Sequence, residues 1–461
     1  MSAAIMGPAV STFFNPQFAT PFSGAATPFV YLICVAVMLL VSSGIVEMAR
    51  EFPSAGAFYT YVSRGIGPRA GFVTGGLMFV AYALLPPAEI GLIGAYVQST
   101  LQAEFGLNVP WWLIGVVPVS LMVALAYRGI ATSLRAALIL FGAEVTVIVV
   151  LAVIVVGKGG DDGISLHPLS PAASPHGVGG ITTGFVFAAL SFVGFEAAAT
   201  LGEEIRAPRR TVPKAIVLSV LAVGLLYVFC IWAEVLGIGE QAANELTGAS
   251  LPWNDLAQRY ATWMKWPVII AAVSSMFAVM VNSSNGIVRI THAMGRDRLL
   301  PAFLAEVNPR FRTPSKAIVA QGVFAAGLAV VVGLLSGPFS DPVAGFNVYG
   351  YLGFLLTLAI LPVYVLTNLA AVNWFRAKGT FSILRHLVLP LAGACLMIAL
   401  LYGQIREQTT APYTWFPWVI LGWTAIVVTA AIWIGRAKPE QMERAGQLLA
   451  VGDSEDLQQK A

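Results

Sequence analysis

The sequence predicts an all-α integral membrane protein, and two observations lead to this fold class. First, 57% of the 461 residues are hydrophobic and only 11% are charged, whereas a soluble domain carries about 25% charged residues on the surface that faces water. Second, apolar runs of roughly 20 residues recur along nearly the whole chain, and each is long enough for a helix to cross about 30 Å of hydrocarbon. The chain is therefore expected to cross a membrane many times.

The apolar runs divide the chain into twelve predicted spans, of which the first is short. These spans cover residues 1–14, 27–49, 71–101, 110–129, 134–156, 180–204, 213–239, 264–292, 316–336, 344–374, 386–404 and 415–435. The remaining residues, 436–461, are polar and are expected to form a solvent-exposed tail.

The basic residues predict the orientation of the spans. If the spans alternate from a cytoplasmic N-terminus, all but four of the 26 Lys and Arg residues fall on the cytoplasmic side. Because positive charge accumulates in cytoplasmic loops, this arrangement is favoured over its inverse. We therefore expect an inner or plasma membrane protein with a cytoplasmic C-terminus.

The predicted sixth span contains residues that are unfavourable in a membrane helix. Its segment ALSFVGFEAAATLGEE (189–204) holds Gly194 in mid-run, and Glu196 follows two positions later. Backbone in hydrocarbon must satisfy its own hydrogen bonds, so a broken helix is tolerated only against protein or a polar cavity. One interpretation is such a break, which would turn free N–H and C=O groups toward a mid-membrane site. The alternative is a glycine that lets two helices pack closely.

Three separated motifs resemble the amino acid–polyamine–organocation (APC) transporter superfamily. They are FVGFEAAATLGEEIRAPRRTVPKAI (192–216), EMAREFPSAGAFYTYVSRGIGPRAGFVTGG (47–76) and HAMGRDRLLPAFLAEVNPRFRTP (292–314). The resemblance extends from residue 1 to about 435 and implies an amino-acid permease. It also implies a core (1–374) of two inverted five-helix repeats, 1–156 and 180–374, in which spans one and six are discontinuous. Two additional helices (375–435) and a cytoplasmic tail would complete the chain.

The same resemblance implies a substrate site where spans one and six unwind. Gly7-Pro8-Ala9 matches the family's G-x-G break, with Ala9 in place of the second glycine. Only six residues precede Gly7, so we expect half of the first helix to be missing. Amides at this break suit a substrate carboxylate, and carbonyls near Ala188–Phe192 suit an ammonium group. The predicted substrate-binding residues are Met6, Gly7, Pro8, Ala9, Ala188, Ser191, Phe192, Gly194 and Tyr349. Leu190 stands where many relatives have an aromatic gate, a role that Phe187 or Phe192 is expected to fill.

Three intramembrane glutamates are functional candidates, because a charge at mid-membrane is costly. Glu144 lies near the middle of span five, where proton-coupled relatives often carry a lysine, and is the main candidate for proton coupling. Its alternative role is a neutral group hydrogen-bonded as structural glue. Glu196 is a second coupling candidate, and either a gate or a structural anchor. Glu89 follows the Pro86-Pro87 pair, and either contacts a basic substrate or packs at a proline kink.

A polar group in span eight offers a candidate sodium site. In sodium-coupled relatives of this architecture, hydroxyl groups on span eight hold Na⁺ beside span one, and Ser283 and Ser284 are the matching candidates here. Oxygen ligands suit such a hard cation. The alternative is that these hydroxyls only form hydrogen bonds between helices.

The predicted function is secondary amino-acid transport, with proton-coupled symport by alternating access as the main hypothesis. An exchanger without net ion coupling and a membrane amino-acid sensor are the alternatives. P-loop, HExxH and GxSxG motifs are missing from the sequence, which argues against an enzyme and against ATP-driven transport. We expect no cofactor, no metal site and no nucleic-acid partner. The expected ligand is an amino acid or amine, the coupling ion is H⁺ or Na⁺, and the protein is a monomer or homodimer surrounded by lipid.

Overall fold

The computed structural model describes residues 6–53, 56–129, 134–200, 207–296, 301–407 and 411–437, and all regular structure within these ranges is helical. The principal helices are α2 (Pro8–Phe13), α3 (Asn15–Ser23), α4 (Thr27–Glu51), α5 (Ala57–Gly65), α6 (Pro68–Phe105), α7 (Trp111–Tyr127), α8 (Leu134–Gly157), α9 (Gly177–Leu190), α10 (Ala197–Thr200), α11 (Pro208–Ile238), α12 (Glu240–Asn244), α13 (Pro252–Tyr260), α14 (Lys265–Arg296), α15 (Ser315–Leu335), α16 (Pro342–Lys378), α17 (Leu389–Glu407) and α18 (Phe416–Ala437).

The helices have the length and composition of membrane spans. Nine apolar stretches within the described ranges are long enough to cross a bilayer, and α7 and α9 are shorter apolar helices. Large apolar side chains face outward on the peripheral helices, for example Val117 on α7, Leu335 on α15 and Trp433 on α18. Because such a surface is unstable in water, the fold is that of a multi-pass membrane protein.

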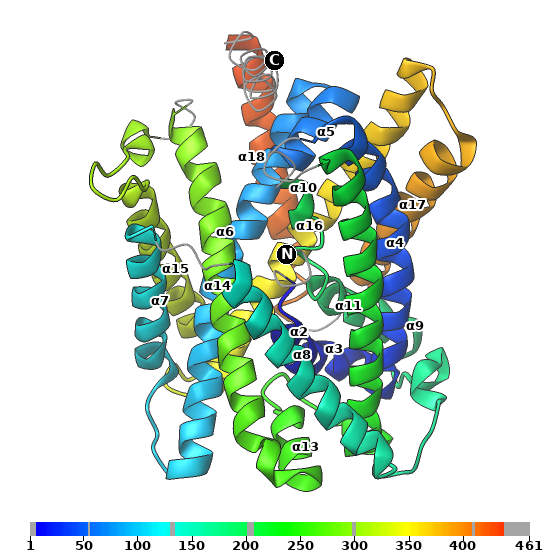
Figure 1. Cartoon of the computed structure of the whole chain (residues 1–461), viewed down its shortest axis with the longest axis vertical. Coiled ribbons are helices and arrows are strands. Elements are labelled where there is room, and N and C mark those ends of the chain that lie inside the picture. The colour runs from blue at the N-terminus through cyan, green and yellow to red at the C-terminus, as the bar shows by residue number, and fades with distance from the viewer. Residues whose placement is uncertain are drawn as a thin grey trace.

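Figure 1 shows how these helices are arranged around the chain's beginning. The short helices α2 and α3 lie in the middle of the molecule, and longer helices such as α6, α11 and α14 surround them. The helix α5 lies near one end of the molecule and α13 near the other. The segment that the sequence places on the cytoplasmic side (47–76) and the loop that it places outside (240–263) are therefore at opposite ends.

The predicted end of the first span is wrong. The span was expected to end at residue 14, but helical structure continues through α3 to Ser23. The sequence was misleading because Asn15 and Gln17 interrupt the apolar run. In the structure both side chains are buried, at 2% and 0% exposure, so these polar groups face the protein interior rather than lipid.

Some predictions fall outside the described residues. The acidic part of the motif after span six (201–206), most of the predicted polar tail (438–461) and the first five residues of span one all lie there. The predicted fifth span, 134–156, agrees closely with α8.

Candidate functional site

The sixth predicted span is interrupted at the glycine that the sequence singled out. The helix α9 ends at Leu190 and α10 begins at Ala197, and the residues between them form turns. Phe192 donates its N–H to Ala189 O at 3.0 Å, an i to i−3 bond in place of the α-helical ladder. Gly194 has a φ of 105°, which is a conformation that residues with a Cβ rarely adopt. Of the two interpretations of this segment, a broken helix or a glycine that only allows close packing, the structure contains the broken helix.

The first described helix, α2, begins at the other predicted break. Gly7 has a φ of 56°, and α2 starts directly after it with Pro8, whose missing N–H costs nothing at a helix start. A Cβ on Gly7 would stand 2.5 Å from Val279 Cγ2, so a close approach to α14 also requires glycine here. The side chain of Ala9, which replaces the family's second glycine, is fully buried.

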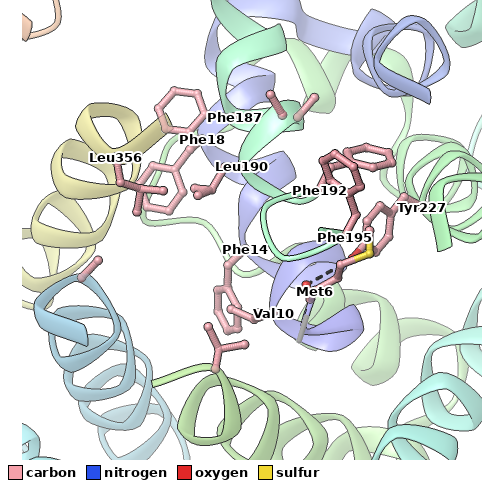
Figure 2. Close-up of a cluster of buried hydrophobic side chains, with 14 of the residues drawn as sticks. Met6, Val10, Phe14, Phe18, Phe187, Leu190, Phe192, Phe195, Tyr227 and Leu356 are labelled. Atoms are coloured by element: carbon pink, nitrogen blue, oxygen red, sulfur yellow. Dashed lines mark hydrogen bonds between the residues drawn. The ribbon is translucent and has the colours of Figure 1, made fainter. Parts of the chain in front are cut away.

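The two breaks meet through side chains that sequence reasoning largely missed. The Tyr227 hydroxyl on α11 donates to Met6 O at 3.3 Å and to Ser191 O at 3.2 Å, so one tyrosine joins the start of α2 to the break after α9. Figure 2 shows Tyr227 and Met6 facing each other, with the hydrogen bond dashed. The Ser11 hydroxyl also donates to Met6 O.

A hydrogen-bonded group is centred on Ser191. The Ser191 hydroxyl accepts a bond from Asn15 Nδ2 at 2.9 Å and lies 2.9 Å from the Tyr31 hydroxyl. Asn15 Oδ1 in turn accepts a 2.6 Å bond from the Tyr349 hydroxyl. These contacts join α3, α4, α11 and α16 to the break. We call this group the Ser191 network; its members are Asn15, Tyr31, Ser191, Tyr227 and Tyr349.

Aromatic side chains enclose the Ser191 network. Phe18 stacks on Phe187 with ring centroids 5.8 Å apart, and its other neighbour is Tyr349 at 5.5 Å. Figure 2 shows Leu190 beside this aromatic pair, so Phe187 occupies the region where an aromatic gate was expected. Phe192 packs edge-on against Tyr227 instead. Because Met6, Ser191 and Tyr349 are at most 3% exposed, this conformation is closed to solvent at the site.

Glu144 lies against the first turn of α2, between α8 and α14. Its Oε1 accepts a bond from the Ser274 hydroxyl at 3.3 Å, and the Ser275 hydroxyl and the backbone N–H of Ala9 also interact with the carboxyl group. The Ser275 hydroxyl accepts a further bond from the N–H of Val10 at 3.3 Å. A carboxylate beside a helix N-terminus is stabilised by the helix dipole, so its charge state affects how firmly α2 is held.

The described hydroxyl contacts with Glu144 and α2 come from Ser274 and Ser275, while the sodium role of Ser283 and Ser284 stays a prediction. Ser283 donates to Val279 O at 2.8 Å and to Met280 O at 3.0 Å, both on its own helix, and Ser284 follows it as a buried neighbour. Ser274 and Ser275, more than two turns earlier on α14, make the contacts with Glu144 and α2. Ser274-Ser275 and Ser283-Ser284 are both serine pairs in the same apolar span, so the sequence alone does not distinguish them. Within the described ranges no three His, Cys, Asp or Glu side chains are grouped for metal binding.

Glu196 is fully buried within the break and holds three hydrogen bonds. Its Oε1 accepts from the Tyr82 hydroxyl at 2.9 Å, and its Oε2 accepts from Gly194 N at 3.0 Å and from the Tyr364 hydroxyl at 3.2 Å. These donors come from α6, from α16 and from the break itself. Of the two roles considered for Glu196, gate or anchor, this geometry favours the anchor.

The interrupted helix α9–α10 and the start of α2 meet at a buried polar group in a multi-pass helical bundle, an arrangement typical of transport proteins with a mid-membrane site. The chain belongs to the amino acid permease family, whose model matches residues 14–436. The family and the relatives found are transporters, so the protein is a transporter and not an enzyme.

The relatives differ in the solutes that their names give. The chain is 25% identical over 393 residues to the low-affinity putrescine importer PlaP of Escherichia coli K12, covering 83% of this chain and 81% of that protein. It is 24% identical to the branched-chain amino acid permease BcaP of Lactococcus lactis, covering 87% and 86%. It is also 25% identical to cationic amino acid transporter 7 of Arabidopsis thaliana, covering 68% and 56%.

Proposed function

We propose that the protein is a secondary active transporter that moves an amino acid or amine across the plasma or inner membrane by alternating access, driven by protons. The observation that carries the proposal is the position of Glu144, a carboxyl group held between α8, α14 and the first turn of α2. The relatives' names include a diamine, branched-chain amino acids and cationic amino acids, so they support this solute class without choosing within it.

Substrate would bind at the two breaks. At the start of α2 a carboxylate would meet the positive end of the helix dipole and the N–H groups of Ala9 and Val10, which contact Glu144 and Ser275 in this conformation. The turn after α9 offers the Ser191 carbonyl and hydroxyl to an ammonium group. The Ser191 carbonyl and hydroxyl already accept hydrogen bonds from Tyr227 and Asn15. An arriving substrate would replace these bonds with its own, so that no buried polar group is left unpaired.

Proton coupling would work through the start of α2. As a carboxylate, Glu144 accepts bonds from the α14 hydroxyls and faces the N-terminal end of α2, whereas protonation removes the charge that the helix dipole favours. The free-energy difference between α2 bound to Glu144 and α2 moved away from it would then depend on whether Glu144 is protonated.

In this proposal twelve spans form two inverted repeats, 1–156 and 180–374, with a cytoplasmic C-terminus. Spans one, two, six and seven move against a scaffold of spans three, four, eight and nine.

Reconstituted protein tests the function directly. Purified protein in liposomes is given labelled leucine, lysine or putrescine under an imposed pH gradient. Accumulation that follows the gradient supports symport. Uptake that requires substrate already inside the liposome supports exchange, and saturable binding without flux supports a sensor. Replacing external Na⁺ with choline separates the two candidate ions.

Glu144→Gln tests the coupling group. The amide keeps the size of the side chain but cannot bind and release a proton, so proton-driven accumulation is expected to fall to the equilibrium level. Substrate-for-substrate exchange, which needs no net proton movement, is expected to persist. Glu240→Gln, on an exposed carboxylate that pairs with His167, is the control. Accumulation by the Glu144 variant that equals the parent and keeps its pH dependence would contradict the role of Glu144.

A further inference from the structure

One buried carboxyl group is left without a partner. The structure describes four glutamates that are at most 5% exposed: Glu89, Glu144, Glu196 and Glu234. Glu144 and Glu196 hold the bonds given above, and Glu234 accepts a 2.7 Å bond from Trp253 Nε1. Glu89, at 1% exposure, has no hydrogen-bond partner for either oxygen among the described residues. An unpaired ionisable group inside a membrane protein is costly, and its retention indicates a function.

Glu89 lies two residues before a close contact between α6 and α16. Two residues further along α6, a Cβ on Gly91 would stand 2.7 Å from Gly345 O. The same Cβ would stand 2.7 Å from the Cβ of Val348, the residue before Tyr349 on α16, and Glu89 contributes electrostatically to the surroundings of Tyr349. Tyr349 is the member of the Ser191 network that donates to Asn15. Glu89 is therefore associated with the Tyr349 end of the network, which is connected to Ser191 through Asn15.

The face of α6 that carries Glu89 also reaches the first helix. Tyr96 follows Glu89 by seven residues, which is two helical turns and so the same face. The Tyr96 ring packs edge-on against Phe14, with centroids 5.1 Å apart. The same α6 face thus borders both the first helix and the Ser191 network. The pair Pro86-Pro87 lies inside the helix just before Glu89, and its two missing N–H groups remove backbone hydrogen bonds there.

A substrate with two charged ends matches this arrangement. One end is satisfied by the main-chain groups at the two breaks, as the proposed function holds. The other end would meet Glu89, whose carboxyl group has no hydrogen-bond donor among the described residues and is suited to a cationic one. We propose that Glu89 receives the second cationic group of a dibasic substrate, which is a diamine or an amino acid with an ammonium side chain. This inference rests on the proposed transport function and selects the substrate class within it.

The wild-type protein gives the first test. In proteoliposomes, unlabelled putrescine, butylamine, lysine and leucine compete for uptake of whichever labelled solute is transported. Putrescine and butylamine share a four-carbon chain and differ in the second amine. A charge-assisted bond to Glu89 is expected to make putrescine and lysine about 10- to 100-fold better competitors than butylamine and leucine.

The variant Glu89→Gln gives the second test. The amide keeps the shape of the side chain and loses its charge, so the preference for the two-cation solutes is expected to fall by about 10- to 100-fold while competition by leucine and butylamine is unchanged. Glu89→Asp, which keeps the charge, is expected to retain part of the preference. Glu104→Gln on the same helix, where the carboxylate pairs with Lys265 near the surface, is the control.

The outcomes separate this inference from the transport function. If leucine is transported and dibasic solutes compete no better than their neutral or monoamine analogues, the inference is overturned and the function stands. If Glu89→Gln changes the pH dependence but not the preference among solutes, Glu89 is a proton-binding group and the inference also fails. If no amine or amino acid is bound or moved, the proposed function itself is wrong.

Discussion

Ser191 shows how one small side chain determines the geometry of the site. Its hydroxyl contacts Asn15 and Tyr31, while its carbonyl accepts a bond from Tyr227. Helices that are far apart in sequence are thereby joined at the residue that directly follows the end of α9. Because all of these groups are buried, losing one partner leaves others unsatisfied, and this is more costly than losing a single bond at a surface.

Ser191→Ala is therefore expected to weaken substrate binding. Removing the hydroxyl takes away one of the two oxygens proposed to accept a bond from the substrate ammonium group, at a cost of about 1–3 kcal/mol, or roughly a 5- to 150-fold loss of apparent affinity. The matched control is Ser283→Ala, since that hydroxyl bonds only to its own helix among the described contacts. Substrate affinities from concentration-dependent uptake check the prediction. Equal affinities in the two variants would contradict it, and a change in Na⁺ dependence in Ser283→Ala alone would revive the sodium site.

The sequence predicted some site residues and missed others for a physical reason. Gly194 was predicted because a glycine in an apolar span is itself a local signal of a break, Gly7 because it matches the family's break in span one, and Ser191 because it lies beside the break in span six. Asn15 and Tyr227 were missed because their role is made by contacts with residues 176 and 221 positions away. A tyrosine in an apolar span is equally typical of packing, so only the folded arrangement separates the two roles.

At the scale of the element, the start of α2 is determined by two properties of Gly7. Its φ of 56° is unfavourable for a residue with a Cβ, and the space that a Cβ needs is taken by Val279 and Val10. The sequence predicted this break but placed the end of the first span too early. An apolar run predicts the part of a helix that contacts lipid. The part of α3 that carries Asn15 and Gln17 is buried in protein, so its polar residues ended the predicted span too early.

Gly7→Ala is expected to disturb the site at the level of the helix. The left-handed backbone costs about 1–2 kcal/mol for a residue with a Cβ, and the overlap with Val279 requires α2 or α14 to shift. Thermal unfolding in detergent should show lower stability, and uptake should fall. The control, Gly286→Ala on α14, has no neighbouring atom within 4 Å of the new methyl group and removes a helix-weakening glycine. If the two variants are equally stable and active, the backbone conformation at Gly7 is not required for stability or transport, and the prediction is contradicted.

At the scale of the whole molecule, composition and apolar spacing were sufficient to predict a helical, multi-pass membrane protein. They were not sufficient for details such as the helices α12 and α13 (Pro252–Tyr260), which lie in a predicted loop. The outer helix α13 packs onto the first helix through Trp253 and Phe13, whose ring centroids are 4.9 Å apart. The sequence of such a short amphipathic helix resembles that of an ordinary loop. The helix could therefore not be predicted without knowing the surface against which it packs.

In the proposed cycle, a transported solute lies between the two breaks while the site is closed to solvent. A structure determined by electron cryomicroscopy with the best competitor from the uptake assay is the most direct test. The account predicts density for the solute in contact with Met6 and Ser191, with one end directed toward Tyr349 and Glu89. Solute density elsewhere, for example in the apolar groove between α7 and α15 that Val123 and Val323 line, with α9 and α10 joined into an unbroken helix, would contradict it.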